Sequence, residues 1–231
     1  MKIIGSGLIA TAFLIEELGK DVTLFASGVS NSKETSLIEY KREKDLLKSS
    51  LSSSNRLIYF STCSVTDPNL KNSLYVSHKL SLEKLVLTSK NNIVIRLPQV
   101  VGISKNPYTL TNFLAYKIYN EEAYDLFKGS IRNIIDIEDV VTLTKYILNK
   151  KLSDNLYSFN MPIDFEVSEI VSYLEIIIGK RSMHVSKKGH PFKYLSSSFI
   201  SNAISDKVIY CDSNYLEKTL FRAYSNYPNG F

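Results

Sequence analysis

Short apolar runs alternate along the first part of the chain with longer, partly apolar runs that have helical spacing. The short runs fall at residues 2–4, 21–26, 56–61 and 92–97. Strands of a parallel sheet are buried on both faces and are therefore almost continuously apolar. This order predicts an α/β fold with a parallel sheet and helices on both of its faces.

The helices expected between these strands span about residues 8–18, 33–51 and 74–89. In the first of them, Leu8, Ile9, Ala12, Phe13 and Ile15 would form the inner side. Further along, helices are expected at 109–119, 137–148, 168–178 and 213–224, strands at 131–135, 157–159 and 182–186, and an irregular lobe at 189–205.

Composition narrows the classes of function. The chain has 231 residues, a formal net charge of +5 and scattered lysines without a long basic arm, which argues against a nucleic-acid partner. No apolar run reaches the roughly 18 residues that a membrane span needs, so no membrane partner is expected. Two cysteines without metal-site spacing suit the reducing cytoplasm, where we expect this protein.

A glycine turn follows the first strand directly. Gly5-Ser6-Gly7 is followed by Leu8, Ile9 and Ala10, which open the first helix. Two glycines permit a tight turn and let the backbone approach a pyrophosphate closely. The alternative is a simple strand-to-helix turn. We favour phosphate binding because the turn stands between a strand and a helix, as the dinucleotide-binding pattern requires.

Tyr75 and Lys79 are four residues apart in an expected helix, so their side chains share one face. A nearby ammonium favours the phenolate form of a tyrosine, which could then exchange a proton with a substrate hydroxyl or carbonyl. Thr62, at the end of the preceding strand, could hydrogen-bond the same substrate oxygen. The alternative is an ordinary solvated helix face.

These motifs, in this order, resemble the extended short-chain dehydrogenases/reductases, the NAD-dependent epimerase/dehydratase family. The matching segments, which span most of the chain up to about Gly179, are Gly5–Ala10, Tyr59–Val65, Tyr75 with Lys79, Arg96–Gly102 and Arg132–Asp139. The resemblance implies a truncated Rossmann-like parallel sheet, with helices on both faces, plus a small C-terminal substrate lobe. It places the nucleotide-binding domain at residues 1–155, with 98–135 contributing to the substrate side, and the lobe at 156–231.

The resemblance also implies an activity: hydride transfer between NAD or NADP and a nucleotide-linked or otherwise activated sugar, as in polysaccharide biosynthesis. Tyr75 would be the acid/base, Lys79 would support it and hold the nicotinamide ribose, and Thr62 would orient the reacting oxygen. The implied cofactor-binding residues are Gly5, Gly7, Leu8, Ile9, Ala26, Ser27, Lys79 and Pro98. Gln99 and Arg132 would contact the substrate, although Arg132 could equally form a surface ion pair with Asp136 or Asp139.

The chain departs from the family's pattern before the tyrosine, where about two strand–helix units are missing. Residues 22–28 match either the family's second strand or its fourth. In the first case Ala26, Ser27 and Gly28 stand where an acid should hold the adenosine ribose, and in the second the adenosine-binding edge has been deleted. The alternative function is therefore a nucleotide- or partner-binding relative without redox chemistry.

Two further expectations concern metals and assembly. His78, His184 and His190 lack metal-site spacing, so no metal site is predicted. The resemblance suggests a homodimer that pairs through residues 33–51 and 74–89. Leu82, Leu85 and Val86 could make its apolar contacts, although core packing explains them as well.

Overall fold

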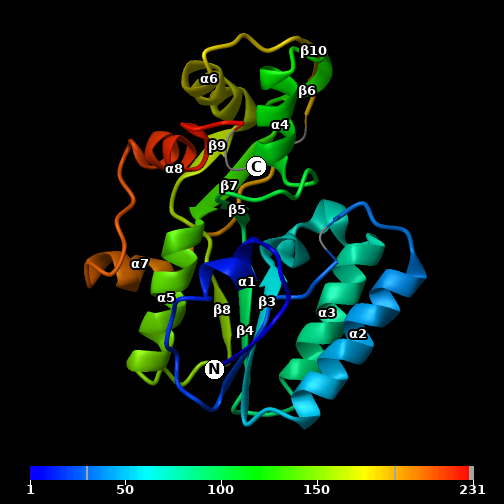
Figure 1. Ribbon diagram of the computed structural model, residues 1–231, viewed down its shortest axis with the longest axis vertical. Helices are drawn as coiled ribbons and strands as arrows, with labels where there is room; N and C mark the ends of the chain where they lie inside the picture. Colours follow the sequence, from blue (N-terminus) through cyan, green and yellow to red (C-terminus); the bar gives the residue numbers. More distant parts are fainter. Residues whose placement is uncertain (30, 190, 229–231) are drawn as a thin grey trace. The chain divides into compact units, whose positions relative to one another are not determined.

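The computed structural model describes residues 1–29, 31–189 and 191–228 (Figure 1). The chain divides into two compact units. Unit 1 comprises Met1–Leu97 and Glu138–Phe159, and unit 2 comprises Pro98–Ile137 and Asn160–Phe231. We expected one main boundary after residue 155, with 98–135 on the substrate side; in the structure that segment belongs to unit 2, because the chain leaves unit 1 after Leu97 and returns for one helix and one strand.

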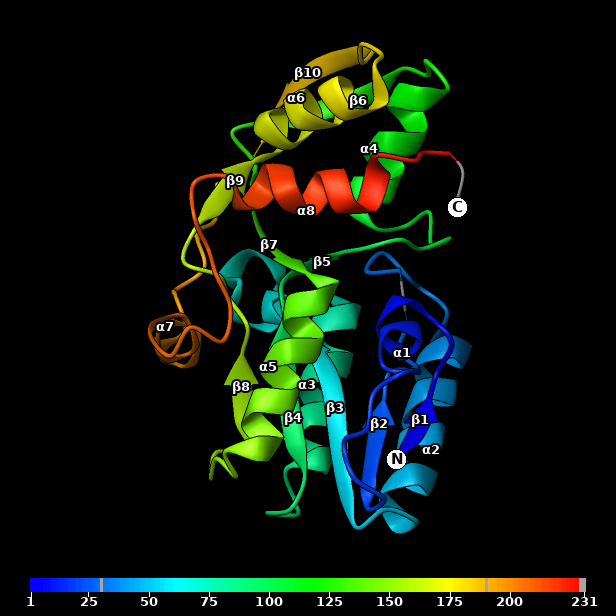
Figure 2. The ribbon, with the colours of Figure 1, turned by 60° about the vertical axis from the view of Figure 1, so that its left-hand side comes forward.

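Unit 1 is built on a five-stranded sheet (Figure 2). In spatial order its strands are β1 (Lys2–Ile4), β2 (Val22–Phe25), β3 (Arg56–Thr62), β4 (Ile93–Leu97) and β8 (Leu156–Ser158), and all neighbours are parallel. The α/β fold with a parallel sheet is confirmed. The four apolar runs form the first four strands, of which β2, β3 and β4 are largely buried and β1 is only partly buried.

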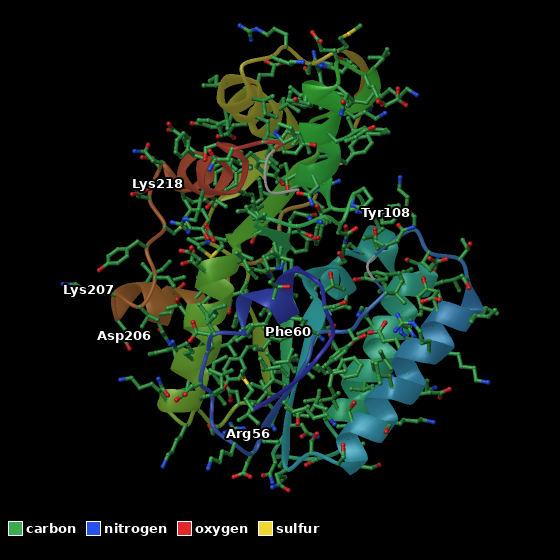
Figure 3. The ribbon with its side chains drawn as sticks, in the orientation of Figure 1. Arg56, Phe60, Tyr108, Asp206, Lys207 and Lys218 are labelled. Atoms are coloured by element: carbon green, nitrogen blue, oxygen red, sulfur yellow. The ribbon has the colours of Figure 1, made fainter. Side chains whose placement is uncertain are left out.

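Helices cover both faces of this sheet. They are α1 (Leu8–Ala12), α2 (Leu37–Ser52), α3 (Leu74–Val86) and α5 (Ile137–Asn149). Tyr59 of β3 belongs to one apolar cluster with Leu47 of α2 and Leu82 of α3. The next residue, Phe60, which is labelled in Figure 3, lies on the other face, and its ring centroid is 5.8 Å from that of Phe13 after α1. Successive strand residues face opposite sides, so α1 lies opposite α2 and α3.

The connections of β1 to β2 and of β2 to β3 step across the sheet in the same direction. Their helices, α1 and α2, lie on opposite faces, so the two crossovers have opposite hands, although such crossovers are almost always right-handed. In a complete doubly wound sheet, of order 3-2-1-4-5-6, the first helix leads to a strand on the far side of strand 1. Here β2 lies between β1 and β3, in the place of strand 4. The fourth-strand alternative is therefore the one that the fold supports.

The first helix is shorter than expected. It ends at Ala12, and Phe13 is its fully buried cap, but Ile15, expected on the inner side, is 91% exposed. The expectation was wrong because the chain turns away from the sheet after Phe13 in order to enter β2.

Unit 2 holds two small sheets. Their strands are β5 (Gln99–Val101), β7 (Ile131–Asp136) and β9 (Asp164–Glu166) in one, and β6 (Tyr124–Lys128) with β10 (His184–Lys188) in the other. Its helices are α4 (Leu110–Tyr119), α6 (Val167–Ile178), α7 (Ser198–Ser205) and α8 (Tyr215–Tyr224). The segment 189–205, expected to be irregular, contains α7, whose Ile200 and Ala203 are buried on one face.

Within the described residues, no helix is long and apolar enough to cross a lipid bilayer.

Candidate functional site

Helix α3 carries the predicted acid/base pair. The Nζ of Lys79 lies 5.7 Å from the centroid of the Tyr75 ring, which is cation–π range. Tyr75 is half-buried near the N-terminus of α3, whereas Lys79 is only 3% exposed. The helix therefore brings the two side chains together as the spacing predicted, with the ammonium on the buried side.

The ammonium of Lys79 is held by Glu43 of α2. Its Nζ lies 2.7 Å from the Glu43 carboxylate and donates to the Tyr59 hydroxyl at 3.2 Å. Glu43 also accepts hydrogen bonds from the Val29 amide at 2.9 Å and the Tyr59 hydroxyl at 3.2 Å, and His78 Nε2 lies 3.1 Å from it. We call these five residues the Glu43 cluster. It ties α2, α3, β3 and the loop after β2 together.

Burial and charge compete within the Glu43 cluster. Burial opposes ionisation of Glu43, but the His78 hydrogen bond and the Lys79 ammonium outweigh it and lower the Glu43 pKa to about 2. Burial likewise opposes the charged form of Lys79, yet its neighbours Tyr59, Tyr75 and Glu43 raise its pKa. Because burial also raises the Tyr59 pKa, that phenol stays neutral and Glu43 supplies the negative charge. Lys79 and Glu43 form a charged pair.

Gly28 lies against the ammonium of Lys79. A Cβ at this position would come within 2.8 Å of Lys79 Nζ and 3.3 Å of the nearer Glu43 oxygen. Such a contact is closer than side chains tolerate without a shift. The loop after β2 thus has a glycine at the position that leaves room for the buried lysine.

Thr62 stands at the carboxyl end of β3. Its hydroxyl accepts a hydrogen bond from the Ser64 amide at 3.2 Å and begins a turn of 3₁₀ helix at Cys63–Thr66. One residue earlier in β3, Ser61 donates to Glu83 of α3 at 2.6 Å. The half-buried Thr62 is therefore fixed at the strand end, next to a residue that is bonded to the helix of Tyr75.

The glycine turn joins the ends of β1 and β2. Gly5 has a φ of +127°, and a Cβ there would lie 2.4 Å from the Ala26 carbonyl oxygen, so a side chain is excluded. Gly7 has nothing within 4 Å of its own Cβ position. Half-buried Leu8 and Ile9 open α1, and Ala26 and Ser27 are half-buried at the end of β2. Phosphate binding at this turn remains a prediction.

Three predicted site residues, Pro98, Gln99 and Arg132, belong to unit 2. Gln99 opens β5 opposite Ile134 of β7, and Arg132 of β7 donates to the Ile131 carbonyl at 2.7 Å. Asp136, one ion-pair candidate for Arg132, accepts from Arg222 at 2.7 Å. The cofactor-binding role of Pro98 and the substrate-binding roles of Gln99 and Arg132 remain predictions.

Sequence reasoning missed Glu43 and Gly28. A signal was present for the acid, because the buried face of α2 carries Tyr40, Glu43, Leu47 and Ser50 at helical spacing. An acid within such a stripe is buried only when it is paired. Its partner, 36 residues away, cannot be read from a local pattern.

The structure also bears on the residues named for a metal site and for a dimer. No group of potential metal ligands occurs among the described residues, and His190 lies outside them. Leu82 and Val86 are fully buried in the core of unit 1, and Leu85 packs against that core. Core packing accounts for all three, and the homodimer remains a prediction.

Comparison with known proteins gave matches only at the level of structure. No family model and no curated protein matches the sequence. The UDP-glucuronic acid 4-epimerase of Bacillus cereus, solved with UDP-glucuronic acid and NAD, is 18% identical; the match covers 88% of this chain and 74% of that one, with a TM-score of 0.67. The UDP-glucose 4-epimerase of Thermotoga maritima, solved with UDP-glucose, is 16% identical, with coverages of 88% and 76% and a TM-score of 0.67.

The chain shares the fold of these two epimerases. A third structure with this fold, RMD from Pseudomonas aeruginosa complexed with NADPH, is 14% identical, covers 94% of this chain and 84% of that one, and has a TM-score of 0.68. The chain is shorter than these structures, of which it covers 74–84%, and within its described residues no strand lies beyond β1 in the sheet.

Proposed function

We propose that this chain is an NAD(P)-dependent oxidoreductase or epimerase that acts on a nucleotide-linked or activated sugar. The observation that carries the proposal is the buried ammonium of Lys79, held one helical turn from Tyr75 and 5.7 Å from its ring. Ends of parallel strands, here those of β1, β2 and β3, are where α/β sheets bind their ligands.

The roles follow from the chemistry of each group. Tyr75 exchanges the proton of the sugar hydroxyl, and Lys79 keeps a positive charge beside the phenol. Thr62 hydrogen-bonds the reacting oxygen and fixes its position. A nicotinamide nucleotide, when bound, takes or returns the hydride at the adjacent carbon. Gln99 and Arg132 are the proposed substrate contacts, since a guanidinium suits phosphate oxygens.

The substrate class rests on the structural neighbours. One is a dTDP-glucose 4,6-dehydratase of Bacillus anthracis in complex with NAD, and others are epimerases solved with UDP-glucose or UDP-glucuronic acid. At 13–19% identity such likeness supports a general kind of reaction and leaves the individual sugar open.

A second candidate function, binding of a nucleotide without redox chemistry, is favoured by the Glu43 cluster. The Lys79 ammonium is already paired with the Glu43 carboxylate, which competes with a hydrogen bond from the ammonium to a ribose hydroxyl. In this case Lys79 is a structural cation, and Tyr75 takes part in no proton transfer.

An activity assay with nucleotide sugars tests the proposed function. The chain is incubated with NAD and with UDP-glucose, UDP-glucuronic acid or dTDP-glucose, and sugar products are separated by chromatography. We expect product, and we expect Tyr75→Phe to lose at least about 100-fold in rate with an unchanged circular dichroism spectrum. Tyr108→Phe, at an exposed position in unit 2, is the matched control and keeps wild-type activity. Full activity in Tyr75→Phe would contradict the acid/base assignment, and nucleotide binding without any product would favour the second candidate.

A further inference from the structure

The sheet of unit 1 ends at β1. This strand hydrogen-bonds β2 on its inner side, and within the described residues no strand pairs with its outer side. A complete doubly wound sheet carries two mononucleotide-binding halves, one on each side of the point where the strand order reverses. Unit 1 therefore keeps β1 and one half, made of β2, β3 and β4, and lacks the other half.

The exposure of side chains beside β1 agrees with this reading. All four residues of β2 are buried, whereas Lys2 of β1 is exposed and Ile3 and Ile4 are only half-buried. Leu14 and Ile15, which follow α1, are 68% and 91% exposed. Within unit 1, the outer flank of β1 is open to solvent.

The position that selects the adenosine ribose is also missing. In dinucleotide-binding sheets an acid about 20 residues after the glycine turn, at the end of the second strand, bonds the ribose hydroxyls. The strand that follows the glycine turn here, β2, instead ends in Ala26, Ser27 and Gly28, and Gly28 lies directly against Lys79. β2 moreover lies on the nicotinamide side of the sheet, in the place of strand 4.

The groups proposed to act on the nicotinamide half are all present. Thr62, Tyr75 and Lys79 lie on β3 and α3, inside the half that remains. Gly5 and Gly7 form the turn that would receive one phosphate. The residues of unit 1 thus fit a nicotinamide mononucleotide and do not fit the adenosine of a dinucleotide.

We infer that this chain recognises its cofactor through the nicotinamide mononucleotide half alone, so that NAD, NADP and the free mononucleotide bind with similar affinity. The inference rests on the proposed function and adds to it the range of cofactors. The 2′-phosphate that separates NADP from NAD belongs to the adenosine half, so the chain does not discriminate between them.

Binding titrations test this inference. The full chain is titrated with NADH, NADPH and reduced nicotinamide mononucleotide, and nicotinamide fluorescence is followed at fixed salt. We expect three dissociation constants within about threefold of one another, and no displacement of the mononucleotide by AMP. A preference of about tenfold or more for either dinucleotide over the mononucleotide would overturn the inference and leave the proposed function standing. Failure of all three to bind would overturn both.

The Ser27→Asp variant is a matched control for the alignment of β2. If the end of β2 were the ribose-binding position, an acid there would raise the affinity for NADH relative to NADPH by about tenfold, because it would bond the ribose and repel the 2′-phosphate. Under our inference Ser27→Asp leaves the ratio of NADH to NADPH affinity unchanged. A new preference for NADH in this variant would overturn the inference.

Discussion

The ammonium of Lys79 lies 2.7 Å from the carboxylate of Glu43, and both side chains are almost completely buried. Removing two charges from water costs free energy that only close pairing and further hydrogen bonds offset. The Tyr59 hydroxyl, the Val29 amide and the His78 ring provide these bonds. The pair therefore fixes α2 to α3 and sets the position of the helix face that carries Tyr75.

Replacing Glu43 alone leaves a buried ammonium without its counter-charge. We expect Glu43→Gln to lower the free energy of unfolding by about 3–5 kcal/mol, measured in urea by circular dichroism. Glu39→Gln on the same helix removes the exposed ion pair with Arg42 and should cost less than about 1 kcal/mol. Equal losses in the two variants would show that the buried ion pair stabilises the fold no more than the exposed one.

Protonation of Glu43 should make the folded chain less stable in acid. The pKa of this carboxyl is about 2 in the folded chain, below its usual value of 4.5, so folding favours the charged form. Its contribution is complete above pH 4.5 and is lost as the pH falls toward 2. Over this interval we expect the wild-type free energy of unfolding to fall by about 3 kcal/mol more than that of Glu43→Gln. Parallel pH curves for the two proteins would contradict this.

Gly28→Ala should be destabilising although the position is exposed. The new Cβ would lie 2.8 Å from Lys79 Nζ, and the ammonium cannot move away without leaving Glu43. We expect a loss of about 1–3 kcal/mol in urea unfolding. In a Lys79→Met background the ammonium is gone, so the same substitution should cost less. An identical cost in both backgrounds would place the strain elsewhere.

Substitutions of the two glycines in the first turn should have different effects: one on stability and the other on cofactor binding. Gly5→Ala forces a side chain into the left-handed region, with its Cβ 2.4 Å from the Ala26 carbonyl oxygen, and should cost about 2 kcal/mol or more. Gly7→Ala has a φ of −82° and free space, so its stability should stay within about 0.5 kcal/mol of wild type. Its affinity for reduced nicotinamide mononucleotide should nevertheless fall about tenfold, because the backbone can no longer approach the phosphate. An unchanged affinity in Gly7→Ala would show that the turn does not bind the phosphate.

The sequence predicted most of unit 1, because apolar runs and helical spacing are local signals. It predicted that Tyr75 and Lys79 share a helix face, but not that Glu43 holds the lysine, since that pairing depends on how α2 packs against α3. In unit 2 the short strands β5, β6 and β9 were missed. Each has only three to five residues, and each pairs with a strand that lies far away in the sequence.

The open flank of β1 has a consequence for local unfolding. This three-residue strand is hydrogen-bonded to a single neighbour, and only Ile4 of its residues packs against the apolar cluster formed by β2, β3, β4, α2 and α3. Segments with few buried contacts open at a lower free energy than the rest of a domain. In deuterium-exchange mass spectrometry, the peptide that contains Lys2–Ile4 should therefore take up label before the peptides of β3 and β4, and a mononucleotide seated at the glycine turn should slow that uptake.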